Sequence, residues 1–318
     1  MDLDVLFIGT AGSAPTARRS LPATLVRRGG DRLLFDCGEG TQRQLLRSIG
    51  LIDLEQIFIT HFHADHFLGL PGMLKTFSLR GRDAPLSVYG PPGLRALFEV
   101  LRPVVGKTSF PLELVELEPN EEIRRDGYSI AAFAVEHRVR AYGYALVEEE
   151  RPGRFDETRA RELGVQPGPD YGRLQRGEEV NGVKPEQVVG EPRRGRKVVL
   201  AGDTAPAEMT RLVAHEADLL IHEATFTMEE RGRARETGHT TAHDAAQLAA
   251  DAEVALLALT HVSPRYAGPE LREEALAVFE RTIVPRDFDR VEIPFPERGE
   301  PIHVRAREAR EPAPEPAA

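Results

Sequence analysis

The chain has 318 residues and a formal charge of −10, because 41 lysine and arginine residues face 51 aspartate and glutamate residues. Hydrophobic residues make up 41% of the chain, which excludes a disordered protein and predicts a sizeable core. The single cysteine excludes an internal disulfide framework and a multi-cysteine zinc module. No apolar run has the roughly 20 residues of a membrane span, and no secretory leader is evident, so we expect a cytoplasmic protein without membrane association.

Short apolar runs alternate with helix-like stretches, which predicts an α/β fold with mixed sheets. The expected strands are Asp4–Ile8, Arg32–Asp36, Gln56–Thr60, Leu86–Tyr89, Tyr128–Val135, Tyr142–Val147, Lys197–Ala201, Asp218–His222 and Val254–Thr260. The expected helices are Gly40–Ser48, Leu68–Leu79, Pro92–Leu101, Pro206–His215, His243–Ala252 and Pro269–Ile283. Local chemistry supports two helix starts, since Pro206 suits a first turn and Thr240 or Thr241 suits an N-cap.

Residues 151–196 are much richer in glycine and proline than the stretches around them. Such a long excursion between two expected strands is usually a functional loop or a mobile insertion. From Arg151 to Lys197 the chain carries 11 basic and 8 acidic residues, a local balance of 11 − 8 = +3. We expect residues 1–310 to form one domain that carries this insertion. The low-complexity residues 311–318 are expected to be disordered.

A cluster of four potential metal ligands, His61, His63, Asp65 and His66, follows the strand expected at Gln56–Thr60. Imidazole and carboxylate together suit zinc, manganese or iron, and the absence of thiolates argues against a structural zinc finger. A histidine-rich polar turn without a metal is the alternative. Four ligands within six residues argue against that alternative.

Three further candidates, His137, Asp203 and His261, each stand just after an expected strand. α/β sheets gather ligands and catalytic groups at the carboxyl ends of their strands. Seven ligands are too many for one metal, whereas seven with one bridging carboxylate suit two metals about 3.5–4 Å apart that activate a water. The residues alone therefore predict metal-assisted hydrolysis and leave the substrate open.

The succession of these motifs resembles the metallo-β-lactamase superfamily, and additional motifs resemble ribonuclease Z, the tRNA 3′-processing endoribonuclease family. The additional motifs are Leu6–Ser13, Phe35–Gln42, Gly69–Met73, Val88–Pro92, Gly202–Thr204, His222–Thr225, Gly238–Thr241 and Thr260–Tyr266. The resemblance implies a four-layer αβ/βα sandwich of two mixed β-sheets. It also implies an endoribonuclease that removes the 3′ trailer from precursor tRNA, leaving a 3′-hydroxyl on the tRNA and a 5′-phosphate on the trailer.

The resemblance further implies two Zn²⁺ ions per subunit, with Mn²⁺ or another divalent metal as a possible substitute, and a homodimer. No other protein partner is evident. The implied first ligand set is His61, His63 and His137, the second is Asp65, His66 and His261, and the bridge is Asp203.

Asp65 also resembles the family's proton acceptor. His239 resembles the histidine that protonates the leaving 3′ oxygen, and Glu223 resembles the carboxylate that holds this histidine. Without the family context, Glu223 is a strand-end surface carboxylate and His239 a surface histidine before a helix. Asp36 is expected to orient a ligand imidazole, and Cys37 is expected to be a small buried residue without a nucleophilic role.

Candidate substrate contacts are fewer. Arg265 could pair with a phosphate or with an acidic neighbour. The excursion at 151–196 corresponds in position to the family's flexible tRNA-binding arm, in which Arg173 and Arg176 are candidate phosphate contacts; a solvated insertion is the alternative. Where the family often has a Pro-x-Lys-x-Arg-Asn loop that rejects a mature CCA end, this chain has Ala17 for the lysine and Ser20 for the asparagine. The cleavage position relative to CCA is therefore left open.

Three functions other than precursor tRNA cleavage are compatible with parts of the sequence. A hydrolase of the same fold could act on a small ester, thioester or phosphodiester. A di-iron redox relative would usually need a glutamate in the ligand cluster and a flavin domain, and this chain has neither. A non-catalytic RNA-binding subunit should have lost metal ligands, and all seven are present.

Overall fold

The computed structural model describes residues 1–306, so the tail expected at 311–318 lies outside the described residues. Contacts divide the chain into two compact units. The first unit contains residues 1–123 and 130–146 and resumes at Lys197, and the second contains residues 124–129 and 147–196. Within the described part of the chain, no helix has both the length and the apolar character that crossing a membrane requires.

An eight-stranded mixed sheet is built mainly from the N-terminal half of the chain. Its strands, in spatial order, are β15 (Ile302–Val304), β14 (Arg290–Glu292), β1 (Leu3–Gly9), β2 (Ala23–Arg28), β3 (Asp31–Phe35), β4 (Gln56–Phe58), β5 (Leu86–Gly90) and β6 (Leu112–Glu116). Pairing is antiparallel from β15 to β3 and parallel from β3 to β6. The parallel strands bury continuous apolar runs, as parallel sheets usually do.

A seven-stranded sheet is built from the later part of the chain. Its strands, in spatial order, are β13 (Thr282–Ile283), β12 (Leu257–Thr260), β11 (Leu219–Glu223), β10 (Lys197–Leu200), β9 (Tyr142–Glu148), β8 (Tyr128–Ala134) and β7 (Glu122–Arg125). Pairing is parallel from β10 to β13. The carboxyl ends of these parallel strands therefore meet at one edge of the sheet.

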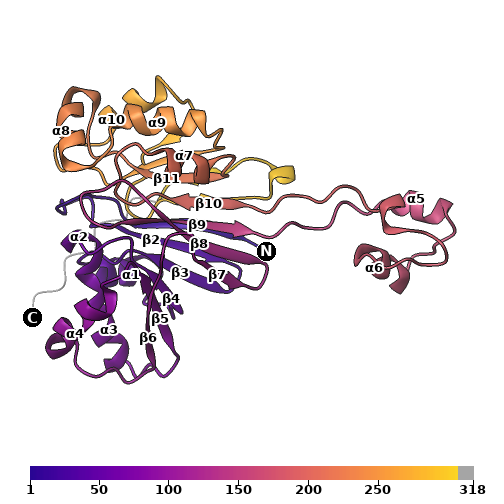
Figure 1. Cartoon of the computed structure of the whole chain (residues 1–318), viewed down its shortest axis with the longest axis horizontal. Coiled ribbons are helices and arrows are strands. Elements are labelled where there is room, and N and C mark those ends of the chain that lie inside the picture. Colours follow the sequence, from indigo (N-terminus) through magenta and orange to yellow (C-terminus); the bar gives the residue numbers. More distant parts are fainter. Residues whose placement is uncertain (307–318) are drawn as a thin grey trace, which may run out of the picture. The chain divides into compact units, whose positions relative to one another are not determined.

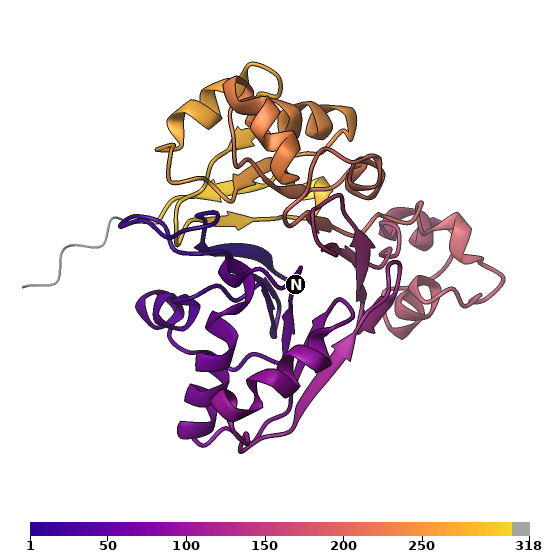
Figure 2. The ribbon, with the colours of Figure 1, turned by 60° about the vertical axis from the view of Figure 1, so that its left-hand side comes forward.

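Helices cover the outer face of each sheet in the first unit, and Figures 1 and 2 show the two helical layers on opposite sides of the strands. Over the first sheet lie α1 (Thr41–Ser48), α2 (Ala64–Phe67), α3 (Gly69–Leu79) and α4 (Leu94–Val105). Over the second lie α7 (Glu208–Ala214), α8 (Arg231–Thr237), α9 (Ala242–Asp251) and α10 (Pro269–Leu276). Short 3₁₀ turns occupy Met228–Glu230 and Pro296–Arg298. The predicted sandwich of two mixed sheets between helices is confirmed.

A separate hydrophobic cluster lies under each helical layer. Under α1, α3 and α4 it is built from large side chains such as Leu45, Met73 and Phe98. Under α9 it is rich in alanine, including Ala245 and Ala249, which lets this helix pack closely on β11 and β12.

The helix expected over Pro269–Ile283 is too long. It ends at Leu276, and Thr282–Ile283 forms β13 beside β12. The helical spacing of apolar residues continues past the end because Val278 and Phe279 pack into the same core from non-helical backbone. Tertiary packing thus produced a helix-like pattern without a helix.

Other expected boundaries were also displaced. The helix expected from Pro206 begins at Glu208, so Pro206 precedes its first turn. The strand expected from Val254 begins only at Leu257, because the Val254 N–H bonds back to the end of α9. Thr241 does cap α9, since its hydroxyl accepts a hydrogen bond from Asp244 N at 3.1 Å.

The sequence patterns did not predict several strands, including β2, β6, β7, β14 and β15. β6 and β7 lie at the sheet edges and carry charged side chains, so their apolar alternation is weak. The helix predicted over Leu68–Leu79 corresponds to α3, and Leu68 separates it from the short α2. The helix predicted to end at Leu101 continues to Val105 although it contains Pro103.

The second unit contains more regular structure than its composition indicates. It holds α5 (Glu157–Glu162), α6 (Pro169–Gln175) and a 3₁₀ turn at Pro185–Gln187. Its own small core is formed by Ala160, Val165, Leu174, Val180, Val183 and Val188. At its base, the buried carboxylate of Glu148 accepts hydrogen bonds at 2.7 Å from Nε and Nη2 of Arg196. A few apolar residues that pack together therefore give regular structure to residues 151–196, whose composition is typical of a loop.

Candidate metal centre

The ends of four strands supply the seven predicted ligands. His61 and His63 lie between β4 and α2, and Asp65 and His66 follow in α2 itself. His137, Asp203 and His261 lie beyond β8, β10 and β12, respectively. The structure brings all seven together in overlapping groups whose candidate ligand atoms lie within 4.8 Å of one another.

The first group contains His61, His63, His137 and Asp203. His61 Nε2 lies 2.8 Å from His63 Nδ1, and His137 Nε2 lies 3.4 Å from that same Nδ1. Asp203 Oδ2 lies 3.9 Å from His61 Nε2. Three imidazoles and one carboxylate thus face a common point, as in a four-coordinate metal site.

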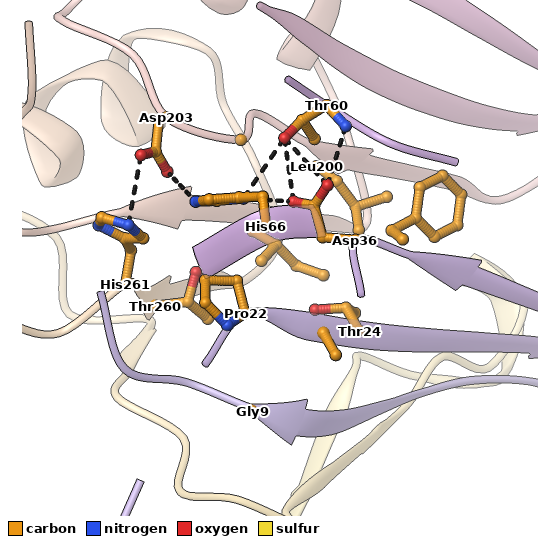
Figure 3. Close-up of a pocket in the computed structure, with 14 residues that line it drawn as sticks. Gly9, Pro22, Thr24, Asp36, Thr60, His66, Leu200, Asp203, Thr260 and His261 are labelled. Carbon is orange, nitrogen blue, oxygen red and sulfur yellow. Dashed lines mark hydrogen bonds and ion pairs between the residues drawn. The ribbon is translucent and has the colours of Figure 1, made fainter. Parts of the chain in front are cut away.

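The second group contains Asp65, His66 and His261. Asp65 Oδ2 lies 3.3 Å from His261 Nε2 and 3.6 Å from His66 Nε2. Asp203 reaches this group as well, since its Oδ1 lies 3.3 Å from His66 Nε2 and its Oδ2 lies 3.2 Å from His261 Nε2 (Figure 3). Asp203 therefore stands between the two groups, where a bridging carboxylate would be.

Outer contacts fix the orientation of the imidazoles. His66 Nδ1 donates to Asp36 Oδ2 at 2.7 Å, on the side of the ring away from Asp203 (Figure 3). His137 Nδ1 donates to the carbonyl of Gly238 at 2.8 Å, and His261 Nδ1 lies 2.8 Å from the Thr225 hydroxyl. When one ring nitrogen is bonded outward, the other is presented to the centre as a metal ligand.

The chemistry of these side chains fits a divalent metal. His66 Nε2 is buried, makes no well-aligned hydrogen bond among the described residues, and faces the carboxylates of Asp203 and Asp65, as the nitrogen of a metal ligand would. Burial holds the pKa of His61 well below its ordinary value, which keeps this imidazole neutral, as ligation requires. Burial alone would raise the pKa of Asp203, but His261 and His66 hold it well below its usual value, so the carboxylate stays ionised.

A carboxylate–imidazole pair lies directly beside the centre. His239 Nδ1 donates to Glu223 Oε1 at 2.7 Å, and His239 Nδ1 lies 4.0 Å from Asp203 Oδ2. Glu223 is 1% exposed and also accepts hydrogen bonds from Thr204 N and the Thr225 hydroxyl. Burial alone would lower the pKa of His239, but Glu223 and then Asp203 outweigh it and raise the pKa to about 9. The imidazole is therefore held in its protonated form at neutral pH.

The three candidate substrate contacts fall in different places. Arg265 lines a cavity of 360 Å³ together with His239 and Ser13, so it lies at the mouth of the centre. Arg173 and Arg176 belong to the second unit, and both form ion pairs with Glu178, at 2.9 Å and 3.4 Å. Glu178 is already counted in the local balance of +3, so that balance does not change, but both candidate phosphate contacts have a carboxylate partner.

The loop after β1 contributes to the centre in a way that the sequence did not reveal. Ser13 N donates to Asp65 Oδ2 at 2.8 Å, from a left-handed backbone conformation with φ 64°. Gly12 lies against His261, and a Cβ on Gly12 would come within 2.4 Å of His261 Nδ1. The motif Leu6–Ser13 was visible in the sequence, but the two contacts join positions far apart along the chain. Strained backbone of this kind is typical of functional sites.

Comparisons with known proteins agree with this geometry. The family model described as the metallo-beta-lactamase superfamily matches residues 19–261. Ribonuclease Z of Natronomonas pharaonis is 48% identical over 307 residues, covering 93% of this chain and 100% of the relative. Ribonuclease Z of Haloferax volcanii is 47% identical over 305 residues, covering 93% and 96%. The crystal structure of the short form of human tRNase Z matches with a TM-score of 0.68 and 28% identity, covering 92% of this chain and 99% of that one.

Gly12→Ala is expected to lower the metal content of the protein, because the added methyl group displaces the His261 ring. Metal per chain, measured by mass spectrometry after dialysis, should fall, while the circular dichroism spectrum stays native. Gly72→Ala is the matched control, since a Cβ at Gly72 meets no atom within 4 Å. Equal metal content in the two variants would contradict a role of Gly12 in seating His261.

Proposed function

The chain belongs to the ribonuclease Z family of the metallo-β-lactamase superfamily, and we propose from this that it removes the 3′ trailer from precursor tRNA by metal-dependent hydrolysis. The products would be a tRNA with a 3′-hydroxyl and a trailer with a 5′-phosphate. The observation that carries the proposal is the Glu223–His239 pair at 2.7 Å beside two ligand groups, the first of which contains Asp203 while the second lies within 3.3 Å of it. This arrangement combines metal ligands with a proton donor for a poor leaving group.

The proposed centre holds two Zn²⁺ ions. His61, His63 and His137 would bind one ion, Asp65, His66 and His261 the other, and Asp203 would bridge them. When bound, such a metal pair lowers the pKa of a water and stabilises the charge of an in-line displacement at phosphorus. The support is the donor set itself, since imidazole and carboxylate ligands without thiolates suit zinc or manganese.

Proton transfer is assigned to two side chains on opposite sides of the displacement. Asp65, whose Oδ2 is oriented by Ser13 N, would accept the proton of the attacking water. His239 would donate a proton to the leaving 3′ oxygen, and Glu223 would keep that imidazole protonated and oriented. A general acid is needed because an unprotonated alkoxide leaves poorly.

We also assign substrate contacts and an assembly. Residues 1–310 would form one catalytic domain, with residues 151–196 as a flexible arm that binds tRNA through phosphate contacts, Arg173 and Arg176 among them. Arg265 would bind a phosphate near the scissile bond, supported by its position in the same cavity as His239. A homodimer is supported by Leu79, Val100 and Val104, which are 77%, 75% and 72% exposed. A cytoplasmic location follows from the proposed substrate.

His63→Ala and Asp203→Ala are each expected to abolish cleavage of a labelled precursor tRNA, because each removes a proposed ligand. Activity is measured with zinc-loaded protein, on substrates with and without an encoded CCA, so that the same gel maps the cut. His215→Ala is the control, since His215 is exposed and lies outside the ligand groups. Cleavage retained in either ligand variant would refute the metal site. If the protein hydrolyses a small ester but does not cleave tRNA, the metal-dependent mechanism is retained and the proposed substrate is wrong.

His239→Asn is expected to lower kcat for precursor tRNA by about 10²–10⁴, the usual contribution of a general acid. Metal content should not change, because His239 is proposed as a proton donor and not as a ligand. A nitrophenyl phosphodiester should be cleaved at nearly the normal rate, since nitrophenolate leaves without protonation. Equal losses on the two substrates would assign His239 to the structure of the site instead of to acid catalysis.

Deletion of residues 155–192 is expected to raise KM for precursor tRNA strongly and to spare the nitrophenyl phosphodiester. The deletion removes the small core of the second unit but keeps the Glu148–Arg196 pair at its base. A short glycine–serine linker joins Arg154 to Arg193 in this variant. If hydrolysis of both substrates falls to the same extent, the arm is structural and does not bind RNA.

A further inference from the structure

A second cavity of the first unit, of 730 Å³, is lined by residues that the proposed reaction does not use, although one of them, Arg19, belongs to the loop in which Ala17 and Ser20 depart from the family pattern. Its wall is formed by the start of α10, by the segment after β13, and by residues 303–306. Arg19, from the loop after β1, closes it on one side. Figure 2 shows the N-terminal segment in indigo beside the C-terminal strands in yellow, and β1 pairs with β14 in that region.

The charged side chains around this cavity are predominantly cationic. Four arginines line it, namely Arg19, Arg272, Arg286 and Arg305, against two carboxylates, Glu273 and Asp289. The formal balance is therefore 4 − 2 = +2 in a chain whose net charge is −10. Within residues 1–306, no ion pair or side-chain hydrogen bond involves the guanidinium groups of Arg272, Arg286 or Arg305.

The carboxylate of Asp289 is already occupied by other donors. Its Oδ2 accepts hydrogen bonds from His303 Nε2 at 2.9 Å and from Arg286 N at 3.0 Å. Its Oδ1 accepts one from Ala306 N at 2.8 Å. Asp289 and the neighbouring Asp287 offset part of the charge of Arg19, and Glu273 is the other carboxylate of the lining, so the four guanidinium groups keep a net positive charge.

Arg19 is held in place with one face of its guanidinium free. It is 8% exposed, and its Nη1 donates to the Thr10 hydroxyl at 2.7 Å and to the carbonyl of Pro285 at 2.6 Å. Its Nη2 makes no hydrogen bond with another described residue. This nitrogen lies at the start of α10, where a Cβ on Gly268 would come within 3.0 Å of it.

The position of Arg19 adds to the positive potential of the helix start. α10 begins at Pro269 after Gly268, and no side chain caps it. A helix N-terminus carries partial positive charge on its free N–H groups, although Pro269 has no N–H and Glu270 in the first turn and Asp287 beside Arg19 offset part of the charge here. The guanidinium group of Arg19 and the start of α10, which no side chain caps, thus line the same cavity.

We propose that this cavity is a phosphate-binding site, in which the start of α10 and the guanidinium groups of Arg19, Arg272 and Arg286 bind a phosphate group. Guanidinium forks match phosphate oxygens in geometry and charge. The volume accommodates a nucleotide-sized ligand. The phosphate belongs either to the backbone of a bound RNA, which rests on the proposed function, or to a free phosphate compound, which does not.

The double variant Arg272→Ala/Arg286→Ala tests the site, because both side chains are exposed and neither contacts the metal centre. Arg43→Ala/Arg95→Ala is the matched control, with the same loss of two exposed charges, on α1 and at the start of α4. Native circular dichroism is required of both. The first measurement is amide hydrogen exchange of residues 268–276 in the metal-loaded protein, with and without inorganic phosphate. Phosphate should slow exchange of this segment in the unchanged protein and in the control, but not in the double variant.

The second measurement is cleavage of precursor tRNA over a range of salt concentrations. If the phosphate belongs to RNA, the double variant should raise KM severalfold and leave kcat unchanged. The slope of log KM against the logarithm of the salt concentration should fall by about 0.7–0.9 for each lost phosphate contact. Hydrolysis of a nitrophenyl phosphodiester should not change.

Each outcome has one meaning. Protection by phosphate together with the KM effect supports the site with RNA as its ligand. Protection alone supports the site with a free phosphate compound as its ligand. If phosphate protects the double variant equally or protects neither protein, and KM is unchanged, the proposal is overturned. If the unchanged protein does not cleave precursor tRNA, the proposed function fails, while the exchange measurement still decides the phosphate site.

Discussion

Asp203 is 2% exposed, and its two oxygens face the imidazoles of His66 and His261, which come from different parts of the chain. An ionised carboxylate in such a position is tolerated only when cations or donors surround it. That requirement decides where three strand ends must lie, because His66 follows β4, Asp203 follows β10 and His261 follows β12. The two sheets therefore meet around one buried charge, and the geometry of the proposed centre depends on that meeting.

The backbone around this charge is shaped for the side chains it presents. Ser13, Asp36 and His261 all adopt left-handed conformations, with φ between 55° and 64°, although none is glycine. Such conformations cost free energy and persist where surrounding contacts enforce them. Here the enforcing contacts are the hydrogen bonds from Ser13 N to Asp65, from His66 to Asp36 and from His261 to Thr225. The strained backbone at these three residues therefore helps to hold the proposed ligands in fixed orientations.

The seven proposed ligands could be predicted from the sequence because each is tied to a local pattern, an apolar strand followed by a polar turn. The outer contacts could not, since Thr225 and the Gly238 carbonyl reach their histidines across 36 and 101 positions of the chain. The same limit explains the errors in the fold. Val278 and Phe279 extended an apparent helix because packing places non-helical residues in the α9–α10 core. In the second unit, a few spaced apolar residues were too sparse to reveal α5 and α6.

The pairing of charged side chains adds information that a count of charges in the sequence does not give. The stretch from Arg151 to Lys197 has a balance of +3, yet Arg173 and Arg176 share Glu178, and Arg196 is buried against Glu148. The cavity proposed to bind phosphate has a smaller balance but includes guanidinium groups without carboxylate partners among the described residues. An unpaired guanidinium group gives up only water when it binds a phosphate, whereas an exposed paired one also gives up an ion pair worth about 0–1 kcal/mol. An acidic protein can in this way bind a polyanion without a basic surface.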